Sequence, residues 1–193
     1  MKTRVWITWE DQRRNRSISR ALEAKLIELK KIDSIKNPII KYGTGICKTL
    51  IVLLKEKPDL VFGQNPSLIL SLFLIIIKRF LGFKVIIDAH NAGLFPLEGR
   101  SRILLELSRI IQQYASLTIV TNVALKAHVE RNGGKAFILP DPIPEFPKTK
   151  RFTLPNPFNL LFICSFAEDE PYEIVFKAAK KLDPSIHIYV TGN

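Results

Sequence analysis

Cysteines and long apolar runs are both scarce in this sequence, and their scarcity excludes several classes of protein. The two cysteines, Cys47 and Cys164, lie far apart in apolar surroundings. This predicts buried free thiols in a reducing compartment rather than a disulfide or a metal site. The longest apolar run, residues 68–77, is closed by Lys78, whereas a membrane-spanning helix needs roughly 20 residues. The run therefore predicts a helix buried inside a fold.

Signals for export and for nucleic-acid recognition are also missing. No apolar core of secretory length follows the amino terminus, so we expect no export and a cytoplasmic location. No zinc-finger spacing, aromatic RNA-binding strand or helix-turn-helix pattern is present. The hydrophobic content of 47% in 193 residues is enough for a packed core and excludes a disordered chain.

Acidic residues are few beside the basic ones, and the excess is uneven. The formal net charge is +11, and residues 1–57 contain 14 Lys or Arg against 6 Asp or Glu. Such a surface attracts anions, which include nucleic acid, acidic lipid headgroups and phosphorylated substrates. Because nucleic-acid motifs are missing, an anionic membrane surface or a phosphate-bearing substrate fits at least as well. A basic nucleotide- or nucleic-acid-binding α/β module remains an alternative.

Strand and helix patterns alternate along the chain. The segment 58–91 predicts a strand, an apolar helix over 67–81 and a second strand ending in Asp88-Ala89-His90-Asn91. Further strands are expected at 4–9, 117–120 and 136–139, with a helix over 102–114. This alternation predicts an α/β fold, a Rossmann-like parallel sheet with helices on both faces.

The region after the first strand contains two helical patterns separated by a weak strand pattern. Apolar residues recur at helical spacing from Ile18 to Leu29, with Ser17 as the N-cap, which predicts a helix there. A weak second strand is expected near residues 32–35, followed by a helix over 46–55.

Prolines divide the chain. Six of the twelve fall within residues 140–157, where neither a helix nor a central strand can continue. We therefore expect a Rossmann-like domain at 1–139, a stiff linker at 140–157 and the start of another α/β domain at 158–193. A piece under about 40 residues rarely folds alone, which predicts an incomplete second unit or a truncated product.

Polar residues stand where the predicted strands end, and ligands of open α/β sheets bind at that edge. His90 could donate a hydrogen bond or accept a proton near neutral pH, and Asp88 either takes part or only orients His90. Asn91 follows them in the same cluster. Gln64 and Asn65 end the preceding strand and either bind a ligand or cap the next helix.

The loop after the first strand carries both acids and bases. Glu10 or Asp11 is placed to take a proton, although a charged surface loop explains them too. Arg13, Arg14 and Arg16 could bind a diphosphate, because guanidinium groups grip phosphate in pairs of hydrogen bonds. A solvated basic loop is the alternative.

Four segments resemble the GT-B glycosyltransferases of the family 4-like group, in particular the chitobiosyldiphosphodolichol β-mannosyltransferases and their prokaryotic relatives. They read FGQNPSLILSLFLIIIKRFLGFKVIIDAHNAG, ASLTIVTNVALKAHVERNGGKAFILPDPI, LLFICSFAEDEPYEIVFKAAKKL and IYVTGN. The resemblance puts His90 at the DxH position of the family's cleft. It implies two Rossmann-like domains, with a lipid-linked or polysaccharide acceptor on the first and a nucleotide-diphosphate sugar on the second.

The same resemblance implies a sugar transfer that needs no metal and no resident cofactor, at the inner face of the cell membrane. It puts Ser165, Glu168, Asp169, Glu170 and Gly192 on the donor side, although acidic residues at a helix start are also explained by the helix dipole. The basic residues that the family uses for the donor diphosphate have no counterpart here. A non-catalytic acceptor-binding subunit, paired with a separate donor-domain chain, is therefore the alternative to an enzyme active by itself.

Overall fold

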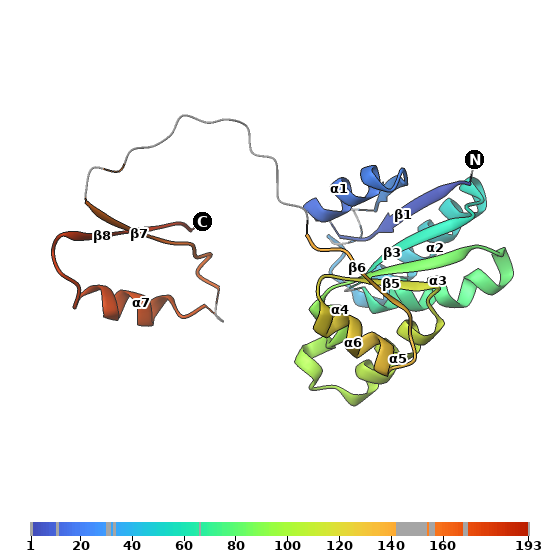
Figure 1. Ribbon diagram of the computed structural model, residues 1–193. Helices are drawn as coiled ribbons and strands as arrows, with labels where there is room; N and C mark the ends of the chain where they lie inside the picture. Colours follow the sequence, from blue (N-terminus) through green and yellow to red (C-terminus); the bar gives the residue numbers. More distant parts are fainter. Residues whose placement is uncertain are drawn as a thin grey trace. The chain divides into compact units, whose positions relative to one another are not determined.

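The computed structural model describes residues 2–10, 12–29, 32, 34–65, 67–141, 154, 157–167 and 170–192. The chain divides into two compact units, Met1–Ile143 and Pro144–Asn193 (Figure 1). Most of the expected linker, including residues 142–153, lies outside the described residues.

Unit 1 is built on a six-stranded, wholly parallel sheet with the strand order β2-β1-β3-β4-β5-β6. The strands are β1 (Arg4–Thr8), β2 (Lys25–Glu28), β3 (Leu60–Asn65), β4 (Lys84–Ala89), β5 (Leu117–Val120) and β6 (Ala136–Ile138). The helices are α1 (Arg13–Ala21), α2 (Pro38–Glu56), α3 (Leu68–Leu81), α4 (Asn91–Leu94), α5 (Arg102–Tyr114) and α6 (Val123–Arg131), with a 3₁₀ turn η2 (Pro96–Gly99). The predicted α/β class is confirmed.

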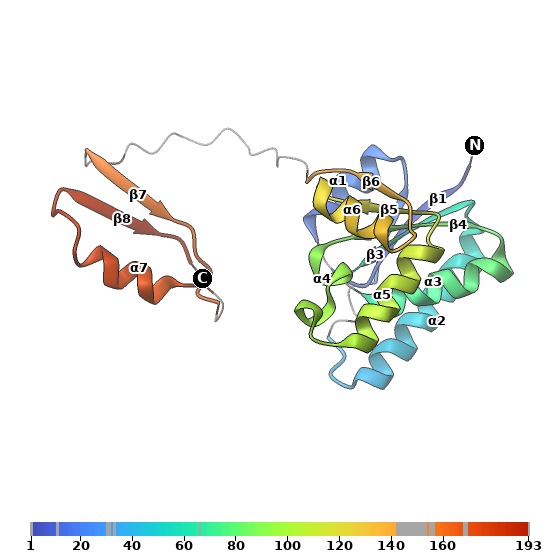
Figure 2. The ribbon, with the colours of Figure 1, turned by 60° about the horizontal axis from the view of Figure 1, so that its bottom comes forward.

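The strand order explains which helix covers which face. From β1 the chain steps to β2 in one direction, and every later step from β3 to β6 runs in the opposite direction. Crossovers between parallel strands are right-handed, so the two directions place their helices on opposite faces. Figures 1 and 2 show α1 on one side of the sheet and α2, α3 and α5 on the other.

The two faces have separate cores. Alternate strand residues such as Val5, Val61 and Val85 pack under Leu74 of α3 and Ile111 of α5 in the larger cluster. The opposite face carries a smaller cluster that contains Trp6, Ile18 of α1, Phe62 and Ile119. The apolar side chains of the sheet are therefore divided between one crowded face and one sparsely covered face.

The prediction for residues 18–35 was wrong. Helix α1 ends at Ala21, Glu23 adopts a positive φ of 52°, and the chain enters β2, which pairs with β1 from Val5↔Lys25 to Thr8↔Glu28. Ile32 is buried, but it belongs to no strand. A four-residue strand is too short for its periodicity to be distinguished from that of a helix.

The helix predicted over 46–55 begins eight residues earlier, at Pro38. Asn37 caps it, because its side-chain oxygen accepts hydrogen bonds from the backbone N–H groups of Ile39 at 3.0 Å and Ile40 at 3.2 Å. Proline suits the first helical position, where its missing N–H costs nothing. The expectation that both cysteines are buried also needs a correction, since Cys47 on this helix is exposed.

Unit 2 contains a two-stranded parallel sheet, β7 (Phe158–Phe162) and β8 (Ile186–Val190), joined through α7 (Tyr172–Ala179). It is one strand–helix–strand crossover, as the sequence predicted. In the part of the chain that the structure describes, no helix combines the length and the apolar character needed to cross a bilayer.

Candidate functional site

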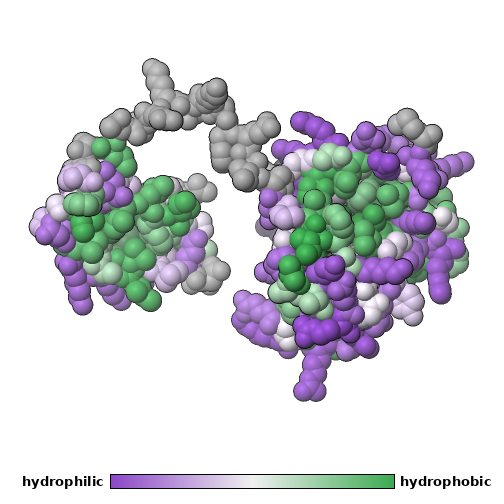
Figure 3. Space-filling model, in the orientation of Figure 1, coloured by the Kyte–Doolittle hydropathy of each residue, from purple (hydrophilic) through white to green (hydrophobic). Residues whose placement is uncertain are grey.

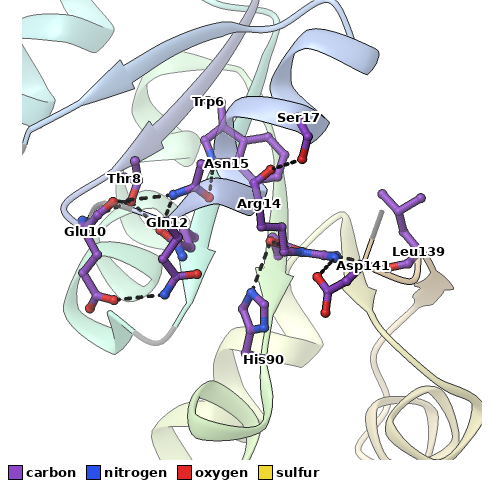
Figure 4. A network of polar contacts seen from close by, with 12 residues as sticks. Trp6, Thr8, Glu10, Gln12, Arg14, Asn15, Ser17, His90, Leu139 and Asp141 are labelled. Atoms are coloured by element: carbon purple, nitrogen blue, oxygen red, sulfur yellow. Dashed lines mark hydrogen bonds and ion pairs between the residues drawn. The ribbon is translucent and has the colours of Figure 1, made fainter. Parts of the chain in front are cut away.

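The carboxyl ends of the strands carry a buried polar network on the α1 side of the sheet (Figure 4). The pairing Gln64↔Asp88 puts these two side chains on one face, and Thr8 lies on that face too because Trp6 pairs with Phe62. The first turn of α1 then brings polar side chains over the strand ends.

Arg14 holds the centre of this network and is only 7% exposed. Its Nε donates to Oδ2 of Asp88 at 3.0 Å, and its Nη2 donates to Oδ1 of Asp88 at 3.0 Å. The guanidinium also donates to the backbone oxygen of Leu139 at 3.0 Å and forms an ion pair with Asp141. Burial by itself would lower the pKa of Arg14, but the two carboxylates raise it above its ordinary value. Arg14 is thus fully engaged within the protein.

A second chain of hydrogen bonds begins at Trp6. Its indole Nε1 donates to Oδ1 of Asn15 at 3.1 Å, and Nδ2 of Asn15 donates to Oε1 of Gln64 at 2.8 Å. The hydroxyl of Thr8 also contacts this Gln64 oxygen. The side chains of Asn15, Gln64 and Thr8 are all buried. They fix α1 on the sheet.

His90 follows β4, and 28% of its side chain is exposed. Its Nε2 lies 3.7 Å from Oδ2 of Asp88, which is longer than a hydrogen bond. Its backbone oxygen accepts from the N–H groups of Gly93 and Leu94 and so begins the short helix α4. Asn91, the next residue, is exposed.

Three buried polar atoms at this edge have no hydrogen-bond partner among the described residues: Nε2 of Gln64, Oδ1 of Asn65 and Nε2 of His90. Buried polar atoms are nearly always satisfied, so each exception needs an explanation. A bound ligand or an ordered water would supply the missing partner. Gln64 and His90 therefore remain candidate site residues, although Gln64 also helps to fix α1 on the sheet.

A cavity of about 340 Å³ opens beside the strand ends, on the side of α2 and α3. Most of its wall is apolar, with Trp9, Tyr42, Leu68 and other residues. Two charged side chains, Glu10 and Lys41, also line it. The cavity is formed by residues that follow β1, β3 and β4, and by the first turns of α2 and α3.

The other predicted residues of the first loop have different positions. Asp11 and the side chain of Arg13 lie outside the described residues. Arg16 is exposed and pairs with Glu28 of β2 at 3.3 Å. Sequence reasoning missed Lys41 and Tyr42, although the Asn37-Pro38 helix start was a signal that this segment is helical.

In unit 2, Glu170 stabilises the loop that follows β7. Its carboxylate accepts hydrogen bonds from the thiol of Cys164 at 3.1 Å and from the backbone N–H groups of Ser165 at 2.8 Å and Ala167 at 3.2 Å. These bonds, with that of Cys164 the largest, lower the pKa of Glu170. The loop residues Glu168 and Asp169 lie outside the described residues.

Gly192 packs on the ring of Phe166, which leaves no room for a Cβ atom. Among the described residues, no group of three or more His, Cys, Asp or Glu side chains could hold a metal ion.

No family model and no curated protein matches the sequence. Solved structures do match the fold. The chain is similar to HepE from Anabaena in complex with UDP, with a TM-score of 0.62 and 11% identity over 98% of this chain and 60% of that one. The S. aureus MnaA–UDP structure matches with a TM-score of 0.60 and 14% identity, over 100% of this chain and 62% of the other.

Arabidopsis thaliana UGT89C1 in complex with UDP-L-rhamnose is a third match, with a TM-score of 0.53 and 13% identity over 98% of this chain and 58% of the other. The chain has a GT-B-like fold. It spans about 60% of the length of the HepE chain, and at these identities the similarity shows the fold alone.

Proposed function

We propose that the chain is all or part of a GT-B glycosyltransferase, which transfers a sugar from a nucleotide-diphosphate sugar to a lipid-linked or glycan acceptor. Its nearest functional model is the chitobiosyldiphosphodolichol β-mannosyltransferase-like group. Residues 1–139 form the acceptor side, and residues 158–193 contribute to the donor side. The observation that carries the proposal is the 340 Å³ cavity at the carboxyl ends of parallel strands, whose wall combines apolar side chains with Glu10 and Lys41.

The lining of this cavity supports an acceptor with an apolar part and a phosphate. Trp9, Tyr42 and Leu68 offer apolar and aromatic surface, which suits a prenyl chain or a sugar face. Lys41 supplies a cation at the same cavity, and an ammonium group attracts phosphate. Arg14 takes no part in this role, because its guanidinium is bound to Asp88, Asp141 and Leu139.

The chemistry requires one base. Glu10 of the cavity wall, or His90, removes the proton from the acceptor hydroxyl. The freed oxygen forms a bond to the anomeric carbon of the sugar, and the bond from that carbon to the nucleotide diphosphate breaks. The diphosphate leaves with the electron pair. Asp88 acts only as a positioning residue in this scheme, since Arg14 holds both of its oxygens.

The donor side is proposed from unit 2, where Glu170 braces the loop of Ser165 and Gly192 follows β8. This arrangement supports a role for the loop in shaping a nucleotide-sugar site.

The outer surface of α2 and α3 supports a position at an anionic membrane. Ile51, Leu54 and Phe80 are exposed there, with Lys48 and Lys55 on the same helix as the first two. Exposed apolar side chains beside lysines are typical of proteins that lie on acidic lipid surfaces.

The test is sugar transfer by the purified chain, with UDP-glucose, UDP-N-acetylglucosamine or GDP-mannose as donor and a short polyprenyl-diphosphate N-acetylglucosamine as acceptor. Release of the nucleoside diphosphate that depends on acceptor supports the proposal. We expect His90→Ala to abolish transfer with little change of the melting temperature. Lys41→Gln should raise the acceptor KM, whereas Lys126→Gln on α6, away from the cavity, should not.

A non-catalytic acceptor-binding subunit is the second candidate. The apolar wall of the cavity, with Lys41 beside it, would bind an acceptor without a donor site in the same chain. Acceptor binding that needs Lys41, without release of nucleotide from any donor, would support this candidate. Failure to bind the acceptor, together with tight and steeply salt-dependent binding of duplex DNA, would contradict both.

A further inference from the structure

The α1 side of the unit 1 sheet is only half covered. Among the described residues α1 is the one helix on that face, because only the step from β1 to β2 runs in the direction that places a helix there. Parallel strands are normally buried on both faces. Here β3 to β6 have helices on one face and an open groove on the other.

The groove has a volume of about 580 Å³ and an almost wholly apolar floor. Four adjacent strands provide that floor with alternate residues, among them Leu60, Phe62, Ile86, Ile119, Phe137 and Leu139. Phe137 is 54% exposed, which is unusual for a strand of a parallel sheet. Figure 3 shows apolar side chains gathered on this side of unit 1, over the strands beside α1.

The two ends of the groove differ in charge. At the carboxyl ends of the strands, Arg14 is neutralised by Asp88 and Asp141. At the amino ends, Lys2 and Arg4 line the groove, and Arg4 pairs with the exposed Glu23 at 3.6 Å. The pairing Leu60↔Lys84 adds a third cation to this face. Among the residues that the structure describes, none of those lining the groove is acidic, so its amino end is complementary to carboxylates.

The width of the groove suits one helix. Neighbouring strands are about 4.8 Å apart, so β3 to β6 span roughly 14 Å, and a helix with its side chains is about 10 Å wide. Helix α1 already forms the first member of a helical layer on this face, and a second helix would pack beside it at about 8–10 Å.

A symmetric dimer in which the α1 sides of two chains face each other does not fit this groove. The outward side of α1, which a second copy would present, is polar, with Arg16, Ser17 and Arg20 all exposed. Such a dimer would place arginines over an apolar floor and near Lys2 and Arg4 of the first copy. Both contacts are unfavourable.

We propose that the open half of this sheet face is the docking site for an amphipathic α-helix of a partner polypeptide. Its apolar stripe covers the partly exposed Ile86 and Leu117 and the exposed Phe137. Carboxylates at one end of the helix pair with Lys2 and Lys84. The interaction buries strands that unit 1 leaves exposed and does not involve the sugar site.

The test uses a fluorescein-labelled peptide of 18 residues, capped at both termini, with leucines at helical spacing on one face and three glutamates in its first turn. Titrated with the full chain, it should bind one to one and increase the fluorescence anisotropy. Phe137→Ser should weaken binding at least tenfold. Phe80→Ser removes a more exposed phenylalanine, 77% exposed on α3, and should leave the affinity unchanged.

Two further experiments vary the charge at the amino end of the groove and the order of residues in the peptide. Lys2→Glu should weaken binding of the glutamate peptide. The same variant should strengthen binding of a peptide in which three lysines replace the three glutamates. A scrambled peptide of the same composition should not bind. Hydrogen exchange in β5 and β6 of the wild-type chain should slow when the peptide is added, which checks the site without any substitution.

Several results would overturn the proposal. The scrambled peptide could bind as tightly as the designed one, or Phe137→Ser could bind the designed peptide as tightly as the wild type does. Hydrogen exchange in β5 and β6 could also be unaltered by the peptide. A wild-type dimer that Phe137→Ser dissociates, seen by sedimentation, would assign the groove to a second copy. Binding of phosphatidylglycerol vesicles that needs Phe137, without peptide binding, would assign it to a lipid surface. None of these measurements depends on sugar transfer, so they fail or succeed separately from the proposed function.

Discussion

Replacing Arg14 with methionine should destabilise unit 1 more than any change of an exposed arginine. Methionine keeps much of the apolar stem but removes the guanidinium, which makes two 3.0 Å hydrogen bonds to Asp88. The Asp88 carboxylate, 1% exposed, is then left buried and unpaired. Breaking a buried ion pair in this way costs about 3–5 kcal/mol, which is a large part of the 5–15 kcal/mol that typically stabilises a domain.

Urea unfolding at 25 °C measures this loss. Tryptophan fluorescence reports on unit 1 alone, because Trp6 and Trp9, the only tryptophans, both lie in it. The double variant Arg14→Met/Asp88→Leu should recover part of the loss, since it removes the unpaired charge as well. The single variant Asp88→Leu leaves Arg14 paired with Asp141. It should therefore lower the free energy of unfolding less than Arg14→Met does.

The matched control is Arg16→Met. Arg16 also lies on α1 and pairs with a carboxylate, but its side chain is 52% exposed, and such pairs contribute about 0–1 kcal/mol. A loss below about 1 kcal/mol for Arg14→Met, or a loss equal to that of Arg16→Met, would refute the reasoning that the Arg14–Asp88 pair is a buried structural element.

Three further predictions follow from packing, pKa and exposure. Gly63→Ala should cost about 1–3 kcal/mol in urea unfolding, because a Cβ there would lie 2.6 Å from Cδ1 of Leu74; adding Leu74→Val should reduce the loss, and equal stability of Gly63→Ala and wild type would contradict the packing. The pKa of Glu170 is lowered in the folded state, so its contribution to unit 2 is present above the ordinary value of about 4.3 and is lost as pH falls through the folded pKa. Hydrogen exchange in β7 should therefore accelerate in that acid range, and Glu170→Gln should remove the acid dependence; an unchanged profile in the variant speaks against it. Iodoacetamide should modify exposed Cys47 in the native chain and reach buried Cys164, whose thiol pKa is raised by burial, only after denaturation; mass spectrometry of native protein modified first at Cys164 would reverse this assignment.

Much of the fold could be predicted from the sequence, since periodicity and strand-end residues are local signals. The crossover from Leu60 to Ala89 and the single crossover of unit 2 were both recognised from apolar runs with polar or glycine stops. The strand β2 was missed because Lys25–Glu28 is short and partly exposed, so that its pattern matched the preceding helix. Only its pairing with β1 distinguishes the two.

The candidate site was predicted in part. His90 and Glu10 lie at the strand ends as the alternation implied, and their roles stay proposals. The role of Arg14 could not be predicted from its position in a run of basic residues, which the structure places in α1. Its partners, Asp88 and Asp141, are 74 and 127 residues away in sequence, and the burial of Arg14 with Asp88 is a property of the folded sheet.

The sequence by itself determined the parallel α/β class, the strand ends that carry polar side chains, and the division into two units, because each depends on residues that are neighbours along the chain. Tertiary structure alone decided which polar groups satisfy one another and which remain available. It also decided that no helix of the described part of unit 1 covers one half of a sheet face, because coverage depends on the order of strands in space and on the hand of the crossovers between them. Neither is encoded in any local pattern.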